Sequence, residues 1–148
     1  MEIFLRLLLA AGLGAAIGLE REYRKKPAGL RTNILIAVGS ALFTITSIQL
    51  AEIGGTPDRI AAQIVTGMGF LGGGAILRSG TSVTGMTTAA TIWVNAAIGM
   101  AAGSGAYALA AMATAITLVV LGVLPPIEAF FERHSGSTDL NNHTPPGL

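Results

Sequence analysis

Long apolar stretches dominate this sequence, and only short polar stretches separate them. Of its 148 residues, 11% are charged, and the mean hydropathy is +0.65. A soluble domain carries about 25% charged residues, so this chain has too few charges to cover a globule of its size. A helix that crosses a membrane needs about 20 mostly apolar residues. We therefore predict an all-α protein whose natural solvent is the lipid bilayer.

Five segments are long and apolar enough to be predicted as transmembrane helices. They are residues Ile3–Leu19, Thr32–Ala51, Ile60–Leu77, Thr84–Ala102 and Gly105–Leu124. Pro125 and Pro126 are expected to end the last helix, because proline cannot continue one. The segments form one predicted transmembrane domain, residues 1–127. Residues 128–148 are polar, rich in turn formers and without an apolar period, so we predict a short disordered cytoplasmic tail.

The cations lie unevenly around these segments. Five of the nine Lys and Arg residues fall in the first loop, namely Arg21, Arg24, Lys25, Lys26 and Arg31. Arg78 and Arg133 fall on the same side, whereas Arg59 and Arg6, which we expect to pair with Glu2, fall on the other. The positive-inside rule then places the N-terminus outside and the C-terminus in the cytoplasm. The basic loop also suits contact with anionic lipid headgroups.

Charged and polar residues are expected to gather at the cytoplasmic ends of the helices. They are Glu20, Arg21, Arg31, Asn33 and Arg78. Arg31 opens the second predicted helix, which Thr32 or Asn33 could cap. Such a cluster is either structural, or it binds an anionic headgroup or the carboxylate of a partner protein.

Residues 67–74, GMGFLGGG, contain the G-x-G-x-x-G pattern of dinucleotide-binding loops. That function needs a preceding strand and an acidic residue about 20 positions later, yet no Asp or Glu lies between Asp58 and Glu128. We therefore interpret the glycines as packing residues, because small residues let membrane helices approach closely. This places the third helix at the expected centre of the bundle, with a break that lines a polar cavity as the alternative. The predicted packing residues are Gly14, Gly18, Gly67, Gly69, Gly72, Gly73 and Gly74.

Polar residues also recur at helical spacing inside the predicted membrane segments. The spacings of 4, 3 and 4 residues between Thr84, Thr88, Thr91 and Asn95 place these side chains on one helix face. An amide buried in hydrocarbon without a partner costs roughly 2–7 kcal/mol. The stripe therefore either forms hydrogen bonds between helices or lines a path for an ion or small solute. The whole predicted stripe is Gln63, Thr66, Thr84, Thr87, Thr88, Thr91 and Asn95.

The sequence shows none of the side-chain groupings typical of enzymes or metal sites. It has no cysteine, which excludes disulfides and thiolate chemistry, and its two histidines lie in the polar tail without a third ligand. Mg²⁺ prefers hard oxygen ligands such as carboxylates, and the second to fifth segments have none near their middle. Asp58 and Arg59 mark the outer loop. We expect a non-enzymatic protein with no cofactor, no metal site and no nucleic-acid partner.

Several longer motifs together resemble the MgtC/SapB family of bacterial membrane proteins. They are GLERE (18–22), AGLRTN (28–33), RIAAQIVTGMGFLGGGAILR (59–78), VTGMTTAATIW (83–93) and AAIGMAAG (96–103). The resemblance covers residues 1–127 and implies an inner-membrane protein with about five spans. It also implies a link to growth in low magnesium and to bacterial survival inside host cells. Many members continue into a soluble domain of ACT-like fold that this sequence does not contain, so a short form is expected.

The resemblance also implies a mode of action. Some members are thought to inhibit or regulate other membrane proteins, including the F-type ATP synthase. We therefore expect a membrane regulator that acts through the glycines of the third helix and the cytoplasmic charged cluster. The alternative is a transporter of Mg²⁺ or another small ion or solute along the polar stripe. Self-association is a further expectation, because glycine-rich surfaces pack between subunits as well as within one.

Overall fold

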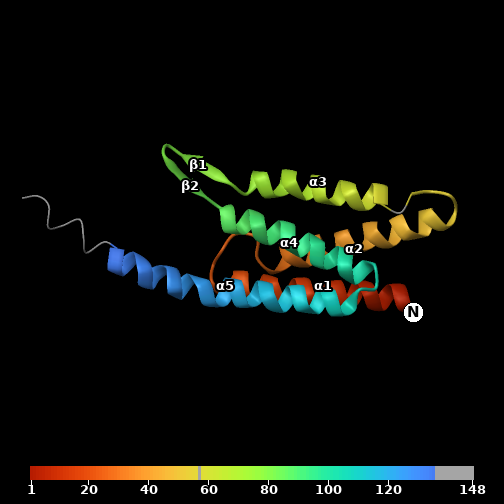
Figure 1. The fold of residues 1–148 in the computed structure, drawn as a ribbon, viewed down its shortest axis with the longest axis horizontal. Helices are drawn as coiled ribbons and strands as arrows, with labels where there is room; N and C mark the ends of the chain where they lie inside the picture. The colour runs from red at the N-terminus through yellow and green to blue at the C-terminus, as the bar shows by residue number, and fades with distance from the viewer. Residues whose placement is uncertain (57, 136–148) are drawn as a thin grey trace, which may run out of the picture.

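The computed structural model of the protein describes residues 1–56 and 58–135, and it is mainly helical, as predicted (Figure 1). The helices lie side by side along the long axis of the molecule. Of the described helices, α1, α2 and α5 are long and apolar enough to cross a membrane. The elements are α1 (Glu2–Tyr23), α2 (Leu30–Glu52), α3 (Asp58–Gly74), β1 (Leu77–Ser79), β2 (Ser82–Thr84), α4 (Met86–Gly103) and α5 (Tyr107–Ser135).

Helices α2 and α4 run parallel and touch through their backbones. Ala37 on α2 faces Gly99 on α4, and one turn further Ala41 faces Gly103. A Cβ atom on Gly103 would lie 2.6 Å from the carbonyl oxygen of Ala41, and one on Gly99 would overlap that of Ala37. Because only hydrogen fits at these positions, the two glycines set the spacing between the helices.

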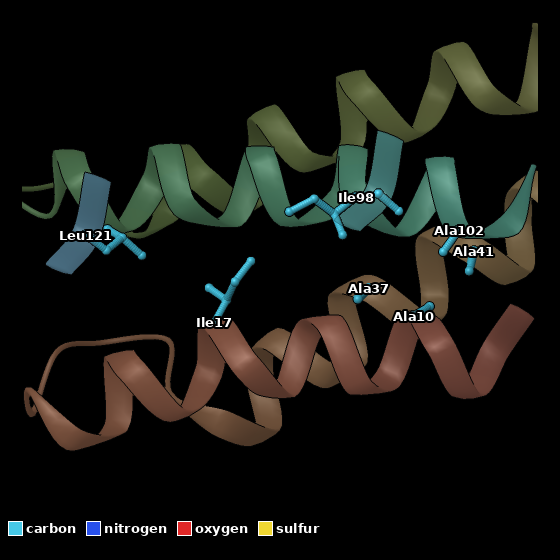
Figure 2. Packing of buried hydrophobic residues seen from close by; sticks show 8 residues of the cluster. Ala10, Ile17, Ala37, Ala41, Ile98, Ala102 and Leu121 are labelled. Carbon is cyan, nitrogen blue, oxygen red and sulfur yellow. The ribbon is translucent and has the colours of Figure 1, made fainter. Parts of the chain in front are cut away.

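Helix α1 completes this centre by packing against α2 and α4. A Cβ on Gly14 would lie 2.7 Å from the carbonyl oxygen of Asn33, and one on Gly18 would lie 2.7 Å from the Cα of Leu30. Ile17 on α1 and Ile98 on α4 are fully buried, and Figure 2 shows them on the facing sides of the two helices. The main apolar core therefore lies between α1, α2 and α4, and α5 adds Ala110 and Leu121 to it.

Helix α3 lies at the edge of the molecule, so the expectation that it forms the centre is wrong. It packs along α4 and contacts α2 less extensively (Figure 1). Its inward side is made of larger apolar residues such as Ile64, which is 5% exposed. Of its glycines, only Gly72 would bring a Cβ within 4 Å of a neighbour, 3.4 Å from the carbonyl oxygen of Ala89. The helix is continuous, so the alternative of a broken helix is also wrong.

A β-hairpin between α3 and α4 was not predicted. Strands β1 and β2 pair antiparallel, with Leu77 opposite Thr84 and Arg78 opposite Val83. Both strands contain apolar residues, so the predicted bounds of the third and fourth helices included part of this region. Gly85 leads from the hairpin into α4 with a φ of +90°, and a Cβ there would overlap the carbonyl oxygen of Ala75. Glycine is therefore required at this junction.

The last helix continues past the point where it was predicted to end. Helix α5 runs through Pro125 and Pro126 to Ser135, which includes residues 128–135 of the predicted tail. The rest of that tail, residues 136–148, lies outside the described residues. A proline inside a helix leaves the carbonyl four residues earlier without its N–H donor. Membrane helices tolerate this where a neighbouring group satisfies the freed carbonyl, and a side chain of α1 does so here.

Candidate functional site

Two buried asparagines join α2 to α4. Asn95 and Asn33 are both 0% exposed. The Nδ2 of Asn95 donates hydrogen bonds to the backbone oxygen of Asn33 at 2.7 Å and to its Oδ1 at 3.1 Å. The Nδ2 of Asn33 in turn donates to the carbonyl oxygens of Ala28 and of Gly29, the latter at 2.9 Å. The pair therefore links α4, α2 and the loop that precedes α2.

The start of α2 is capped by a residue that the sequence did not single out. The backbone N–H of Leu30 donates to Oε2 of Glu22 at 3.1 Å, whereas neither Thr32 nor Asn33 caps the helix. Asn33 was a cap candidate, but its amide donates to loop carbonyls instead. Glu22 lies at the end of α1, eight residues before Leu30. Only the folded loop brings the two together, so the spacing gave no signal.

Arg21 lies inside the bundle, not at its surface. It is 3% exposed, and its Nη2 donates to the Oγ1 of Thr88 on α4 at 2.7 Å. The ion pairs found among the described residues join Arg6 to Glu2 and Arg24 to Glu20, so none involves Arg21. A buried charge is costly unless it is both paired and hydrogen-bonded. The bond to Thr88 supplies one hydrogen bond between α1 and α4, whereas Nε of Arg21 is buried without a hydrogen-bond partner among the described residues.

The members of the predicted charged cluster are not joined to one another. Glu20 pairs with Arg24, one turn along the same helix, where the Arg24 Nε lies 2.6 Å from Oε1. Arg31 is exposed. Arg78 is also exposed, and its Nε donates to the carbonyl oxygen of Gly80 in its own hairpin at 3.2 Å. Within the described part of the chain, no hydrogen bond or ion pair connects Arg21, Arg31 and Arg78.

The predicted polar stripe divides into separate groups. Thr88, Thr91 and Asn95 are buried on one side of α4, where Asn95 and Thr88 bond to α2 and α1. The Thr91 hydroxyl donates to the carbonyl oxygen of Thr87 in its own helix at 2.7 Å. Thr87 itself is exposed beside an apolar groove between α4 and α5. The remaining members are exposed as well, Thr84 in β2 and Gln63 and Thr66 on α3.

A shallow hollow lies between the end of α2 and the start of α3, at the end of the molecule away from the hairpin. Arg59 and Gln63 line it together with the loop that joins the two helices. Arg59 is exposed, and the side chain of Asp58 lies outside the described set. Among the described residues, no group of three His, Cys, Asp or Glu side chains could hold a metal ion.

The outward side of α3 is a helix surface that this chain leaves uncovered. Its exposed small and polar residues are Ala62, Gln63, Thr66, Gly67, Gly69, Gly73 and Gly74, and its exposed larger apolar residues are Val65, Phe70 and Leu71. Ala62 and Gln63 also line the hollow between α2 and α3. A Cβ on any of the four exposed glycines would meet nothing within 4 Å. Phe70 is 85% exposed, Leu71 is 49% exposed and Val65 is 45% exposed, and the other exposed residues around them are mostly small or polar. Small residues are enriched where membrane helices contact other helices, so this side has the composition of an interface.

The model of the MgtC family matches residues 7–130 of this chain. The chain is 52% identical over 129 residues to "Putative magnesium transporter YhiD" of Escherichia coli K12, covering 82% of this chain and 60% of YhiD. It is 45% identical over 143 residues to the uncharacterized protein slr0014 of Synechocystis, and the match covers 96% of this chain and 61% of slr0014. It is 47% identical over 120 residues to Protein MgtC of Brucella abortus, covering 81% and 50%. It thus spans between half and about three fifths of these relatives. No solved structure matches it.

Proposed function

Because the chain belongs to the MgtC family, we propose that it is a multi-pass protein of the bacterial inner membrane that binds or regulates other membrane proteins. In this proposal it is linked to growth under magnesium limitation, and it is neither an enzyme nor dependent on a cofactor. The observation that carries the proposal is the outward side of α3. Partner helices would bind there, and the F-type ATP synthase is among the first partners to test.

All five helices cross the membrane in this proposal, with the N-terminus outside and the C-terminus in the cytoplasm. The parallel contact of α2 and α4 fits such an alternation. If α3 crosses the membrane between them, α2 and α4 must run in the same direction. The α1–α2 loop, the hairpin and the end of α5 lie at one end of the molecule (Figure 1). This end carries most of the cations, which favours the cytoplasmic side. Helix α3 has 17 residues, about 26 Å, and a local thinning of the bilayer would accommodate it.

The glycines and the amide on the outward side of α3 suit contact with another helix. Hydrocarbon offers no hydrogen-bond partner for the amide of Gln63, whereas a polar group on a partner helix does. The glycines of α3 permit close approach, as Gly99 and Gly103 do inside the chain. A partner that covered this side would both satisfy Gln63 and gain van der Waals contact.

Transport of Mg²⁺ is the second candidate, because YhiD, a relative with 52% identity, carries a name that refers to magnesium transport. The path expected from the sequence was the polar stripe. Its buried part, however, is packed against α1 and α2, and Asn95 is 0% exposed. Thr88 and Asn95 take part in interhelical hydrogen bonds and Thr91 bonds within α4, so the arrangement favours the interaction proposal over transport.

The interaction proposal is tested by comparing Gly69→Leu with Gly12→Leu. Both glycines face open space in this chain, so neither leucine clashes within it. Gly12 lies on α1, away from the outward side of α3. We expect Gly69→Leu to abolish co-purification of inner-membrane partners and growth in low magnesium, while Gly12→Leu retains both. Equal behaviour of the two variants would count against α3 as the binding surface.

The transport alternative is tested by Mg²⁺ flux into proteoliposomes that contain the purified chain. The interaction proposal predicts no flux above that of empty liposomes. Saturable flux that Asn95→Leu removes in a folded protein would instead identify a transporter that uses the buried stripe. Folding of the variant is checked by size-exclusion chromatography in detergent.

A further inference from the structure

We propose that the Pro125–Pro126 step is a hinge in α5, and that Arg24 on α1 holds this hinge in one orientation. In an uninterrupted helix, the N–H of residue 126 donates to the carbonyl oxygen of residue 122. Pro126 has no N–H, so it cannot make this bond. The Nη2 of Arg24 donates to the carbonyl oxygen of Gly122 at 2.9 Å. Arg24 therefore supplies, from another helix, the hydrogen bond that Pro126 lacks.

The position of Arg24 suits this role. It is the C-cap residue that follows the last residue of α1, and its Nε lies 2.6 Å from Oε1 of Glu20. The side chains of Arg24 and Glu20 are 34% and 14% exposed, so the ion pair is partly buried. Glu20 thus attracts the guanidinium through an ion pair at Nε, while Nη2 donates a hydrogen bond to α5. An arginine can do this because its donors point in fixed, divergent directions.

This contact couples two distant parts of the sequence. It joins the end of α1 to a point in α5 that lies 98 residues later. Residues 127–135 continue the helix beyond the prolines, at the same end of the molecule as the α1–α2 loop (Figure 1). The direction of this final segment is therefore set by Arg24 as well as by the backbone of α5. Movement of the α1–α2 loop and of the end of α5 is expected to be linked.

Distances between spin labels test the hinge directly, because the chain contains no cysteine to remove first. Leu19→Cys with Glu128→Cys spans the hinge, and Leu19→Cys with Val119→Cys is a matched pair that stops before it. All three positions are exposed. The full chain is measured in lipid nanodiscs. We expect Arg24→Met to widen the distance distribution of the first pair at least twofold and to leave the second pair unchanged.

A rescue experiment then separates the hinge from general packing. Pro126→Ala restores the N–H that Gly122 needs, so adding it to Arg24→Met should return the first pair to its original width. Pro125→Ala is the matched control, because it restores a donor to Leu121 only and should not rescue. Unchanged width in Arg24→Met, or equal rescue by both alanines, would overturn the proposal. If Arg24→Met widens the distance distributions of both label pairs, Glu20→Gln replaces it, because this change removes the ion pair and keeps Arg24. The width of the first pair is then compared between Glu20→Gln alone and Glu20→Gln with Pro126→Ala.

Discussion

The glycines of the α1–α2–α4 core and the glycines of α3 lie in similar apolar segments, yet their neighbours in the structure differ. In the core, Gly14, Gly18, Gly99 and Gly103 each lie against the backbone of a neighbouring helix. On α3, four of five glycines face away from the rest of the chain. A glycine in a membrane helix thus permits close contact with another helix. The sequence around the glycine does not say whether that other helix belongs to the same chain.

The polar residues differ between the same two regions. Asn33, Asn95 and Thr88 in the core are buried and hydrogen-bonded across helices. Gln63 and Thr66 on α3 are exposed. These core side chains therefore find hydrogen-bond partners within the chain, whereas α3 presents glycines and an amide that the rest of the chain leaves uncovered. This difference is the basis of the interaction proposal.

The largest effect is expected from enlarging a core glycine. In Gly99→Leu the side chain has no space beside Ala37, so α2 and α4 must separate. We expect a loss of about 3 kcal/mol or more and little folded protein, because overpacking typically costs about 1–3 kcal/mol even where the structure can relax. Yield and monodispersity in detergent measure this, with Gly39→Leu on the open side of α2 as the control. Normal folding of Gly99→Leu would show that the core is not closely packed.

A smaller effect is expected from removing a core amide. Asn95→Leu leaves the backbone oxygen and Oδ1 of Asn33 without their donor, which should lower the free energy of unfolding by about 1–3 kcal/mol. The matched change on α3 is Gln63→Leu, which should alter it by less than about 0.5 kcal/mol. Reversible unfolding in mixed detergent micelles compares the two. A larger loss for Gln63→Leu would reverse the assignment of core and uncovered surface.

The smallest effect is expected to have the opposite sign. Gly73→Ala adds a methyl group to the last turn of α3, where nothing lies within 4 Å of the added Cβ. Because glycine in a helix interior costs roughly 0.5–1 kcal/mol relative to alanine and the cost is smaller in the last turn, this variant should be more stable by less than that amount. Thermal unfolding of the isolated chain shows the gain, and a drop in the midpoint would mean that Gly73 already packs against something within it.

Much of the fold could be predicted from the sequence because helices in lipid are specified locally. The five apolar segments correspond to the five helices, and their composition identified a membrane protein. The arrangement of the helices was not predictable in the same way. Five glycines in α3 suggested a central helix, yet its larger residues, such as Ile64, make the contacts.

The site predictions had the same limit. Helical spacing placed Thr88, Thr91 and Asn95 on one face, but it could not show that Thr84 belongs to a hairpin. Sequence rules also ended α5 at its prolines, because the hydrogen bond that compensates for Pro126 comes from Arg24, 98 residues from Gly122. Contacts of this kind depend on the packing of distant segments, which a single sequence does not reveal.

Photo-crosslinking from α3 tests the central claim most directly. A photoreactive amino acid is placed at position 69, or at position 12 as the control, in bacteria grown in low magnesium. Both positions face open space in this chain. We predict a discrete protein adduct from position 69 and none from position 12. Identical adduct patterns from the two positions, or lipid adducts alone at position 69, would contradict the claim that α3 is the surface on which this protein binds its partners.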